Sequence, residues 1–120
     1  MKNLIIVMMA ILFSSSAWAQ FESDYNRDGD KVCVKRYDEN GTLRQEGCFV
    51  NNKADGKWTQ YDIQGEVEMV GYYNQDSKEG KWYAFKNDKD TMYEVVYHNN
   101  KVTQSNLWKI HERNLTAGNN

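Results

Sequence analysis

Apolar and aromatic side chains alternate with polar ones over most of the chain, in short runs typical of β-strands. In the middle of the chain, Trp58-Thr59-Gln60-Tyr61 has the pattern of a short strand, and Ile63-Gln64-Gly65 has that of a turn. Val67 to Tyr73 then predicts a return strand, and Asn74 to Gly80 a polar loop. Together these segments predict one β-hairpin followed by a loop.

The hairpin pattern recurs along the chain at intervals of 24 residues. Five positions are identical in two copies: Gly41, Gly47, Gly56, Lys57 and Trp58 recur as Gly65, Gly71, Gly80, Lys81 and Trp82. Aromatic residues follow the same interval in two series, Tyr37, Tyr61 and Phe85, and Tyr25, Phe49, Tyr73 and Tyr97. A third copy has Lys89 and Val95 where the glycines should be. The repeat predicts an all-β fold, an antiparallel meander of successive β-hairpins.

The turn at Asn40-Gly41 sets the expected register. Asn-Gly favours a two-residue type I′ turn, which would pair Glu39 with Thr42. Counting back along both strands then places Val34 opposite Gly47. The repeat extends this register to two further pairs, Trp58 with Gly71 and Trp82 with Val95. A large ring is thus expected to lie across the glycine opposite it.

Strand alternation divides the side chains between two faces. The face expected to pack carries Val34, Leu43, Phe49, Trp58, Val67, Met69, Tyr73, Trp82, Ala84, Tyr93, Val95 and Tyr97. The other face mixes charged, aromatic and apolar residues, namely Lys35, Tyr37, Glu46, Thr59, Tyr61, Glu68, Val70, Tyr72, Tyr83, Phe85 and Glu94.

The repeats are expected to span residues 34–102, after an N-terminal lead-in and partial repeat at 20–33. Residues 103–120 follow the repeats. In this segment Leu107 to Ile110 are expected to cover the open end of the sheet as a C-terminal capping segment, because a terminal repeat must shield an exposed edge. Thr116 to Asn120 are expected to fray.

Residues 1–19 have the three parts of a secretory signal peptide. Met1-Lys2-Asn3 forms a positive start, Leu4 to Phe13 an apolar run of ten residues, and Ala17-Trp18-Ala19 an A-x-A cleavage pattern. The apolar run is shorter than the ~18 residues that a spanning helix needs. We therefore expect an exported chain, periplasmic or extracellular, with no integral membrane span after signal removal.

Composition adds two constraints. Removal of Lys2 with the signal leaves 14 basic and 17 acidic residues, a net charge of −3, which argues against nucleic-acid binding. The exported chain keeps 14 aromatic residues but only five leucines and isoleucines. Aromatic rings are therefore expected to build the core.

The motif Asp55-Gly56-Lys57-Trp58-x-x-Tyr61-x-x-x-Gly65, with Gly71-Tyr72-Tyr73, resembles the second variant of the MORN repeat (membrane occupation and recognition nexus). That variant is found in small exported bacterial proteins and antitoxin-like proteins. The resemblance covers roughly Val34 to Val102. It implies a meandering sheet of hairpins and a binding or scaffolding role instead of catalysis. The acidic exported chain shows no polybasic face for anionic lipid.

Two cysteines, Cys33 and Cys48, remain after signal removal, and an even count in an exported chain favours a disulfide. The Asn40-Gly41 register places them opposite each other as a hydrogen-bonded pair, with Cα atoms ~5.5 Å apart. Free buried thiols and a redox or metal role are the alternatives. Without a Cys-x-x-Cys motif or a neighbouring histidine, the pair does not predict a zinc site.

One metal-like pattern occurs before the first repeat. Asp24, Asn26, Asp28 and Asp30 alternate around Gly29 as in the first half of a calcium loop. The match ends there, because Lys35 stands where the bidentate glutamate belongs. No metal site or other cofactor is therefore predicted, and these four residues remain the calcium candidate beside the alternative of a polar loop.

Catalytic residues are scarce. The exported chain has only His98 and His111, its serines lie in polar contexts, and nothing selects a pair of carboxylates for glycoside hydrolysis. A solvated histidine at a loop edge is the simpler reading of His98. The protein is therefore not expected to be an enzyme.

Aromatic residues off the packed face are the remaining functional signal, and they nominate a binding row: Tyr37, Tyr61, Tyr72, Tyr83 and Phe85. Such a row could bind a glycan or protein by ring contacts, or it could be a second minor core. Two functions stay open. One is a non-catalytic binding or scaffolding protein with a protein or cell-envelope partner. The other is an immunity or antitoxin-like protein that neutralises one dedicated partner.

Overall fold

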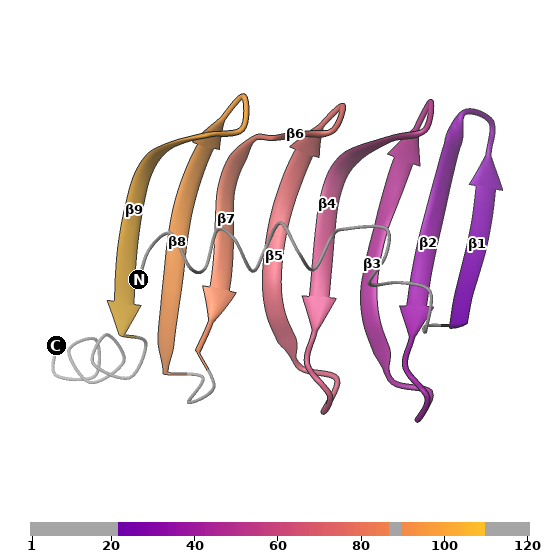
Figure 1. Cartoon of the computed structure of the whole chain (residues 1–120), viewed down its shortest axis with the longest axis horizontal. Coiled ribbons are helices and arrows are strands. Elements are labelled where there is room, and N and C mark those ends of the chain that lie inside the picture. The colour runs from indigo at the N-terminus through magenta and orange to yellow at the C-terminus, as the bar shows by residue number, and fades with distance from the viewer. Residues whose placement is uncertain (1–21, 87–89, 110–120) are drawn as a thin grey trace, which may run out of the picture.

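The computed structural model describes residues 22–86 and 90–109, which form one antiparallel sheet and no helix (Figure 1). Its strands are β1 (Glu22–Asp28), β2 (Lys31–Tyr37), β3 (Leu43–Val50), β4 (Lys53–Tyr61), β5 (Val67–Asn74), β6 (Ser77–Lys78), β7 (Gly80–Phe85), β8 (Thr91–His98) and β9 (Lys101–Lys109). The spatial order follows the chain, with the short β6 paired beside β7 on β5. The prediction of an all-β meander of hairpins is confirmed.

Two-residue turns join the strands at one end of the sheet (Figure 1). Asn51 and Asn52 both have positive φ, and so do Gln75 with Asp76 and Asn99 with Asn100. Two successive residues of positive φ are the mark of a type I′ turn, whose twist matches that of the flanking strands. The sequence predicts a polar loop over Asn74 to Gly80, yet this segment contains the tight turn at Gln75 and Asp76 and the short strand β6.

Hydrogen bonds link successive turns at this end of the sheet. The Asp76 N–H donates to the Ala54 carbonyl at 2.8 Å, and the Ala54 N–H donates to Asp76 Oδ1 at 2.6 Å. The same reciprocal pair joins Asn100 and Lys78 at 3.0 and 2.7 Å, one repeat later. Each turn thus fixes the position of the one before it.

The turns at the opposite end have a different geometry. The Gly41 N–H donates to the Asp38 carbonyl at 3.0 Å, and Asp38 Oδ1 accepts hydrogen bonds from the N–H groups of Asn40 and Thr42. Of these residues only Gly41 has positive φ, at 79°. This is a type I turn completed by a left-handed glycine, stabilised by the aspartate side chain. The predicted type I′ turn, with Glu39 paired to Thr42, is therefore wrong.

The predicted register nevertheless holds. Tyr37 pairs with Leu43, and a bulge between Arg36 and Tyr37 then returns the strands to the expected alignment. The three predicted pairs are all present: Val34 with Gly47, Trp58 with Gly71, and Trp82 with Val95. The turn shifts the strand pairing by one residue, and the bulge shifts it back.

One face of the sheet holds the hydrophobic core, and we call it the packed face. Its buried apolar residues are Val34, Trp58, Met69, Trp82, Ala84, Val95 and Tyr97, all on the face predicted to pack. A ladder of edge-to-face rings crosses it in the order Phe49, Trp58, Tyr73, Trp82 and Tyr97, with centroids 5.0, 6.2, 5.0 and 5.6 Å apart. Such contacts add ~0.5–1.5 kcal/mol per pair beyond area burial.

Trp58 and Trp82 each lie over a glycine of the preceding neighbour strand in the sheet, Gly47 on β3 and Gly71 on β5. A Cβ atom at Gly47 would overlap the Trp58 ring, and one at Gly71 would overlap the Trp82 ring. The indole N–H groups donate to the Cys48 carbonyl at 3.1 Å and to the Tyr72 carbonyl at 3.0 Å. The expectation that each ring covers its own register partner was therefore wrong. These hydrogen bonds hold the rings over the preceding strand.

The end of the chain also differs from expectation. Leu107 and Trp108 belong to β9, the last strand, and remain 55% and 38% exposed. They form the edge of the sheet and do not fold over it, so the capping prediction is wrong for these residues. Ile110, the tail that is predicted to fray and the predicted signal peptide lie outside the described residues.

Candidate functional site

The face opposite the aromatic ladder mixes charged, aromatic and aliphatic side chains, and we call it the mixed face. Register partners from β2 to β9 form one continuous row across it: Lys35, Glu46, Thr59, Val70, Tyr83, Glu94 and Asn106. Partners in neighbouring strands project from the same side of a sheet, so these side chains share one surface.

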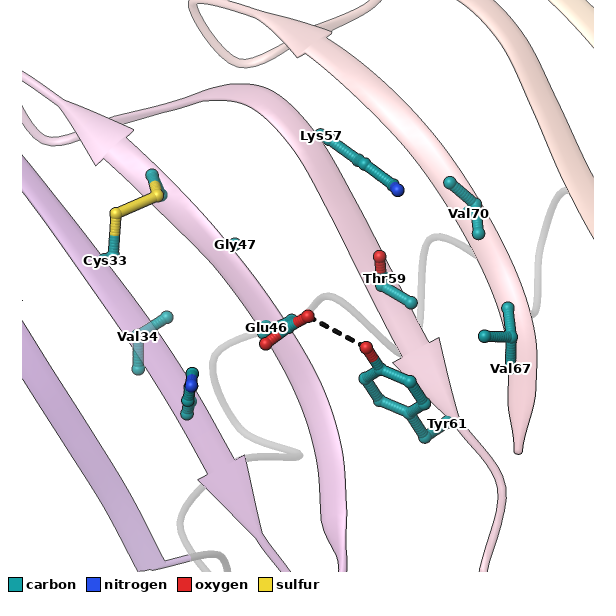
Figure 2. A pocket seen from close by; sticks show the side chains of 11 residues that line it. Cys33, Val34, Glu46, Gly47, Lys57, Thr59, Tyr61, Val67 and Val70 are labelled. Carbon is teal, nitrogen blue, oxygen red and sulfur yellow. Dashed lines mark hydrogen bonds between the residues drawn. A yellow bond between two sulfur atoms is a disulfide. The ribbon is translucent and has the colours of Figure 1, made fainter. Parts of the chain in front are cut away.

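A depression of about 330 Å³ lies on the mixed face over β2 to β5 (Figure 2). The side chains that line it include the Cys33–Cys48 disulfide, Lys35, Glu46, Lys57, Thr59, Tyr61, Val67 and Val70. Sequence reasoning placed several of them on this face but did not single out Lys57 or Thr59 as site residues. The repeated Gly-Lys-Trp motif and the alternation of β4 could have indicated them.

A hydrogen bond joins two side chains that line this depression. The Tyr61 hydroxyl donates to Glu46 Oε1 at 2.8 Å (Figure 2). Burial, and then the bond to Glu46, raise the pKa of Tyr61 to about 12, so the hydroxyl stays protonated at neutral pH. The pair offers a fixed carboxylate acceptor beside an aromatic ring.

Val67 lies on the mixed face, although alternation predicted it on the packed face. A bulge between Gln60 and Tyr61 pairs Tyr61 with Val67, and both line the depression. Leu43 pairs with Tyr37 beyond the equivalent bulge in the first hairpin. The bulges change the alternation at the ends of these strands, which a simple period of two does not anticipate.

The five residues of the predicted aromatic row lie at different levels of the mixed face. Tyr37, Tyr61 and Phe85 end β2, β4 and β7, two strands apart and so ~10 Å from one another. Tyr83 is part-buried in the cross-sheet row, and Tyr72 is 41% exposed opposite Lys57. Of the five, Tyr61 lines the depression. The structure therefore spreads these rings over the face without stacking them in one line.

Cys33 and Cys48 form the predicted disulfide. Their Cα atoms are 4.0 Å apart, close to the short spacing of a non-hydrogen-bonded pair. The predicted spacing of ~5.5 Å for a hydrogen-bonded pair is therefore wrong. The disulfide borders the depression and fixes β2 to β3 there.

The calcium candidate adopts a different geometry from a cation loop. Asp24, Asn26 and Asp28 lie along the extended strand β1, with Asp30 just beyond it. Alternate residues of a strand are ~6.6 Å apart, so these oxygens do not wrap around one point. Residues 22–86 and 90–109 contain no cluster of three or more metal-ligating side chains.

His98 lies at the end of β8, far from the depression in the sheet order. Its Nδ1 is 2.8 Å from Glu79 Oε1, and Glu79 Oε2 accepts the Asn99 N–H at 3.0 Å. These bonds, first the one from Asn99, hold the pKa of Glu79 below its ordinary value. His98 thus belongs to the linked turns, and His111 lies outside the described residues.

Two comparisons with known proteins give no identity. No protein-family model and no curated protein matches the chain. In the part of the chain that the structure describes, no helix has the length and apolarity to cross a membrane.

Proposed function

We propose that this protein is a non-catalytic, exported binding or scaffolding repeat protein that acts through the mixed face of its hairpin sheet. The observation that carries the proposal is the depression around Glu46 and Tyr61 (Figure 2). It combines the hydrogen-bonded Glu46 carboxylate, the Tyr61 ring and the aliphatic side chains of Val67 and Val70 on one surface. Aromatic anchors with polar neighbours are typical of protein interfaces.

The surroundings of the depression support a macromolecular partner. The cross-sheet row extends from Lys35 to Asn106 and contains charged, polar, apolar and aromatic groups. Tyr72 and Lys57 stand beside it and are exposed. A surface of this length suits an extended protein or cell-envelope component better than a small molecule, which is usually enclosed.

Export rests on two features. The sequence of residues 1–19 has the form of a signal peptide, and the disulfide is compatible with an oxidising location. The resemblance to MORN repeats agrees with a binding role. An antitoxin-like protein with one dedicated partner is the alternative within the same class of function.

Site-specific photo-crosslinking in the producing cell tests the proposal. A photoreactive residue at position 72 on the mixed face should capture a partner, whereas one at position 99 should not. Asn99 is the control because it is exposed in the turn between β8 and β9, away from the depression over β2 to β5. Glu46→Gln and Tyr61→Phe should reduce capture at position 72. Equal capture at both positions, or none at position 72, would contradict the proposal.

The identity of the captured molecule separates the two functions. A single protein recovered as a stoichiometric complex favours the antitoxin-like function. A structural component of the cell envelope favours the scaffolding function.

A further inference from the structure

Within residues 22–86 and 90–109, the sheet has two open edges. β1 pairs with β2 alone, and β9 pairs with β8 alone. An edge strand presents unpaired N–H and C=O groups that can pair with another chain. Large exposed apolar side chains also gather on these two strands: Tyr25, Val102, Leu107 and Trp108.

The repeat shows which strand each edge lacks. By the 24-residue interval, β1 corresponds to β3, β5 and β8, since Tyr25 corresponds to Phe49, Tyr73 and Tyr97. β9 follows the other series, β2, β4 and β7. Inside the sheet each strand of that second series is followed by an antiparallel strand of the first. β9 lacks such a follower, and β1 of another copy is a strand of the required kind.

Charge distinguishes this pairing from the symmetric ones. β1 carries three acidic residues, Glu22, Asp24 and Asp28, and one basic residue, Arg27. β9 carries Lys101 and Lys109 and no acidic residue. Pairing β1 with β1, or β9 with β9, would bring like charges together, whereas pairing β9 with β1 brings opposite charges together.

Tyr25 provides an independent observation. In the middle of the sheet its counterpart Tyr73 packs between Trp58 and Trp82. Tyr25 is instead 62% exposed, beside a depression of about 480 Å³ that Phe49 and Val32 also line. A strand added next to β1 would cover more of this exposed ring, and Leu107 of β9 is an exposed apolar residue available for that contact.

We propose that the protein assembles head to tail, with β9 of one copy pairing antiparallel to β1 of the next. This contact is heterologous, so it produces a ring or an open filament. It uses the sheet edges and leaves the mixed face accessible. Its success or failure is therefore independent of the binding function proposed above.

Charge reversal on each edge tests the proposal by analytical ultracentrifugation of the exported chain, residues 20–120. The wild-type mass should rise with protein concentration. Asp24→Lys/Asp28→Lys should need at least about tenfold more protein to associate. This corresponds to a loss of ~1.4 kcal/mol of association free energy. Lys101→Glu/Lys109→Glu should behave in the same way.

Mixing the two charge-reversed proteins should restore association, because each then supplies the edge that the other requires. Lys53→Glu/Lys81→Glu is the matched control, with the same charge change on β4 and β7, and it should associate like the wild type. Circular dichroism should show that all variants fold. A wild-type monomer at every concentration would overturn the proposal, and so would charge-reversed variants that associate normally or a mixture that stays monomeric.

Discussion

The packed face and the mixed face are two sides of the same strands, yet they bury their side chains to different degrees. Trp82 is 0% exposed on the packed face, while Tyr72 is 41% exposed on the mixed face. On the packed face a large ring on one strand occupies the space left by a glycine on the strand before it. A single sheet can therefore bury aromatic rings by packing them flat against its own backbone.

The third repeat extends this comparison within the packed face. Gly47 and Gly71 are each covered by a tryptophan, whereas Val95 pairs with Ser105 on the next strand. A serine leaves room for the valine side chain. The glycine and the tryptophan that covers it are thus both absent at this point of the third repeat.

The largest expected effect is the loss of a ring from the packed face. Trp82→Ala should lower the free energy of unfolding by ~3–5 kcal/mol, because it leaves a cavity between Tyr73 and Tyr97. Tyr72→Ala, on the mixed face, should lower it by less than ~1 kcal/mol. Urea unfolding of both variants measures the difference. Similar losses would mean that both faces are core and that the mixed face is not a binding surface.

The second effect is the loss of the Cys33–Cys48 disulfide on the mixed face. Cys33→Ala/Cys48→Ala should lower the free energy of unfolding by ~3 kcal/mol on the chain-entropy model, for a sequence separation of 15. Urea unfolding with and without reductant is the measurement. Reductant should destabilise the wild type and leave the variant unchanged. Equal urea midpoints for the reduced and oxidised wild type would contradict this expectation.

A methyl group at Gly71 tests the requirement for space beneath Trp82. Gly71→Ala should cost ~1–3 kcal/mol, because the added Cβ overlaps the indole ring. The same change in a Trp82→Ala background should cost much less, since the two residues share one space. The four proteins of this double-mutant cycle can be compared by urea unfolding. Additive effects would show that the glycine is required for another reason.

The smallest effect concerns the linked turns at the edge of both faces. Because the pKa of Glu79 is lowered in the fold, first by the Asn99 N–H and then by His98, its contribution is present above about pH 4.5. It is lost as the pH falls through the lowered pKa. The melting temperature of Glu79→Gln should be below that of the wild type at neutral pH and approach it in acid. A difference that does not change with pH would contradict this assignment.

The strands, their register and the packed face followed from local patterns. Alternation has a period of two, and the 24-residue repeat carries one hairpin's register to the next, so seven buried apolar residues could be assigned to the correct face. The Cys33–Cys48 pair followed from the same register. These predictions needed only neighbours along the chain or directly across a hairpin.

The sequence by itself thus determined the hairpin order, the aromatic core and the disulfide, because each depends on periodicity. The tertiary structure decided which glycine each tryptophan covers, on which face Val67 lies and where the depression forms. Bulges and the hydrogen bonds of Asp38, Trp58 and Trp82 control these features. Such contacts bring together positions whose pairing no period along the chain specifies, since a single extra residue in a strand changes the face of every side chain beyond it.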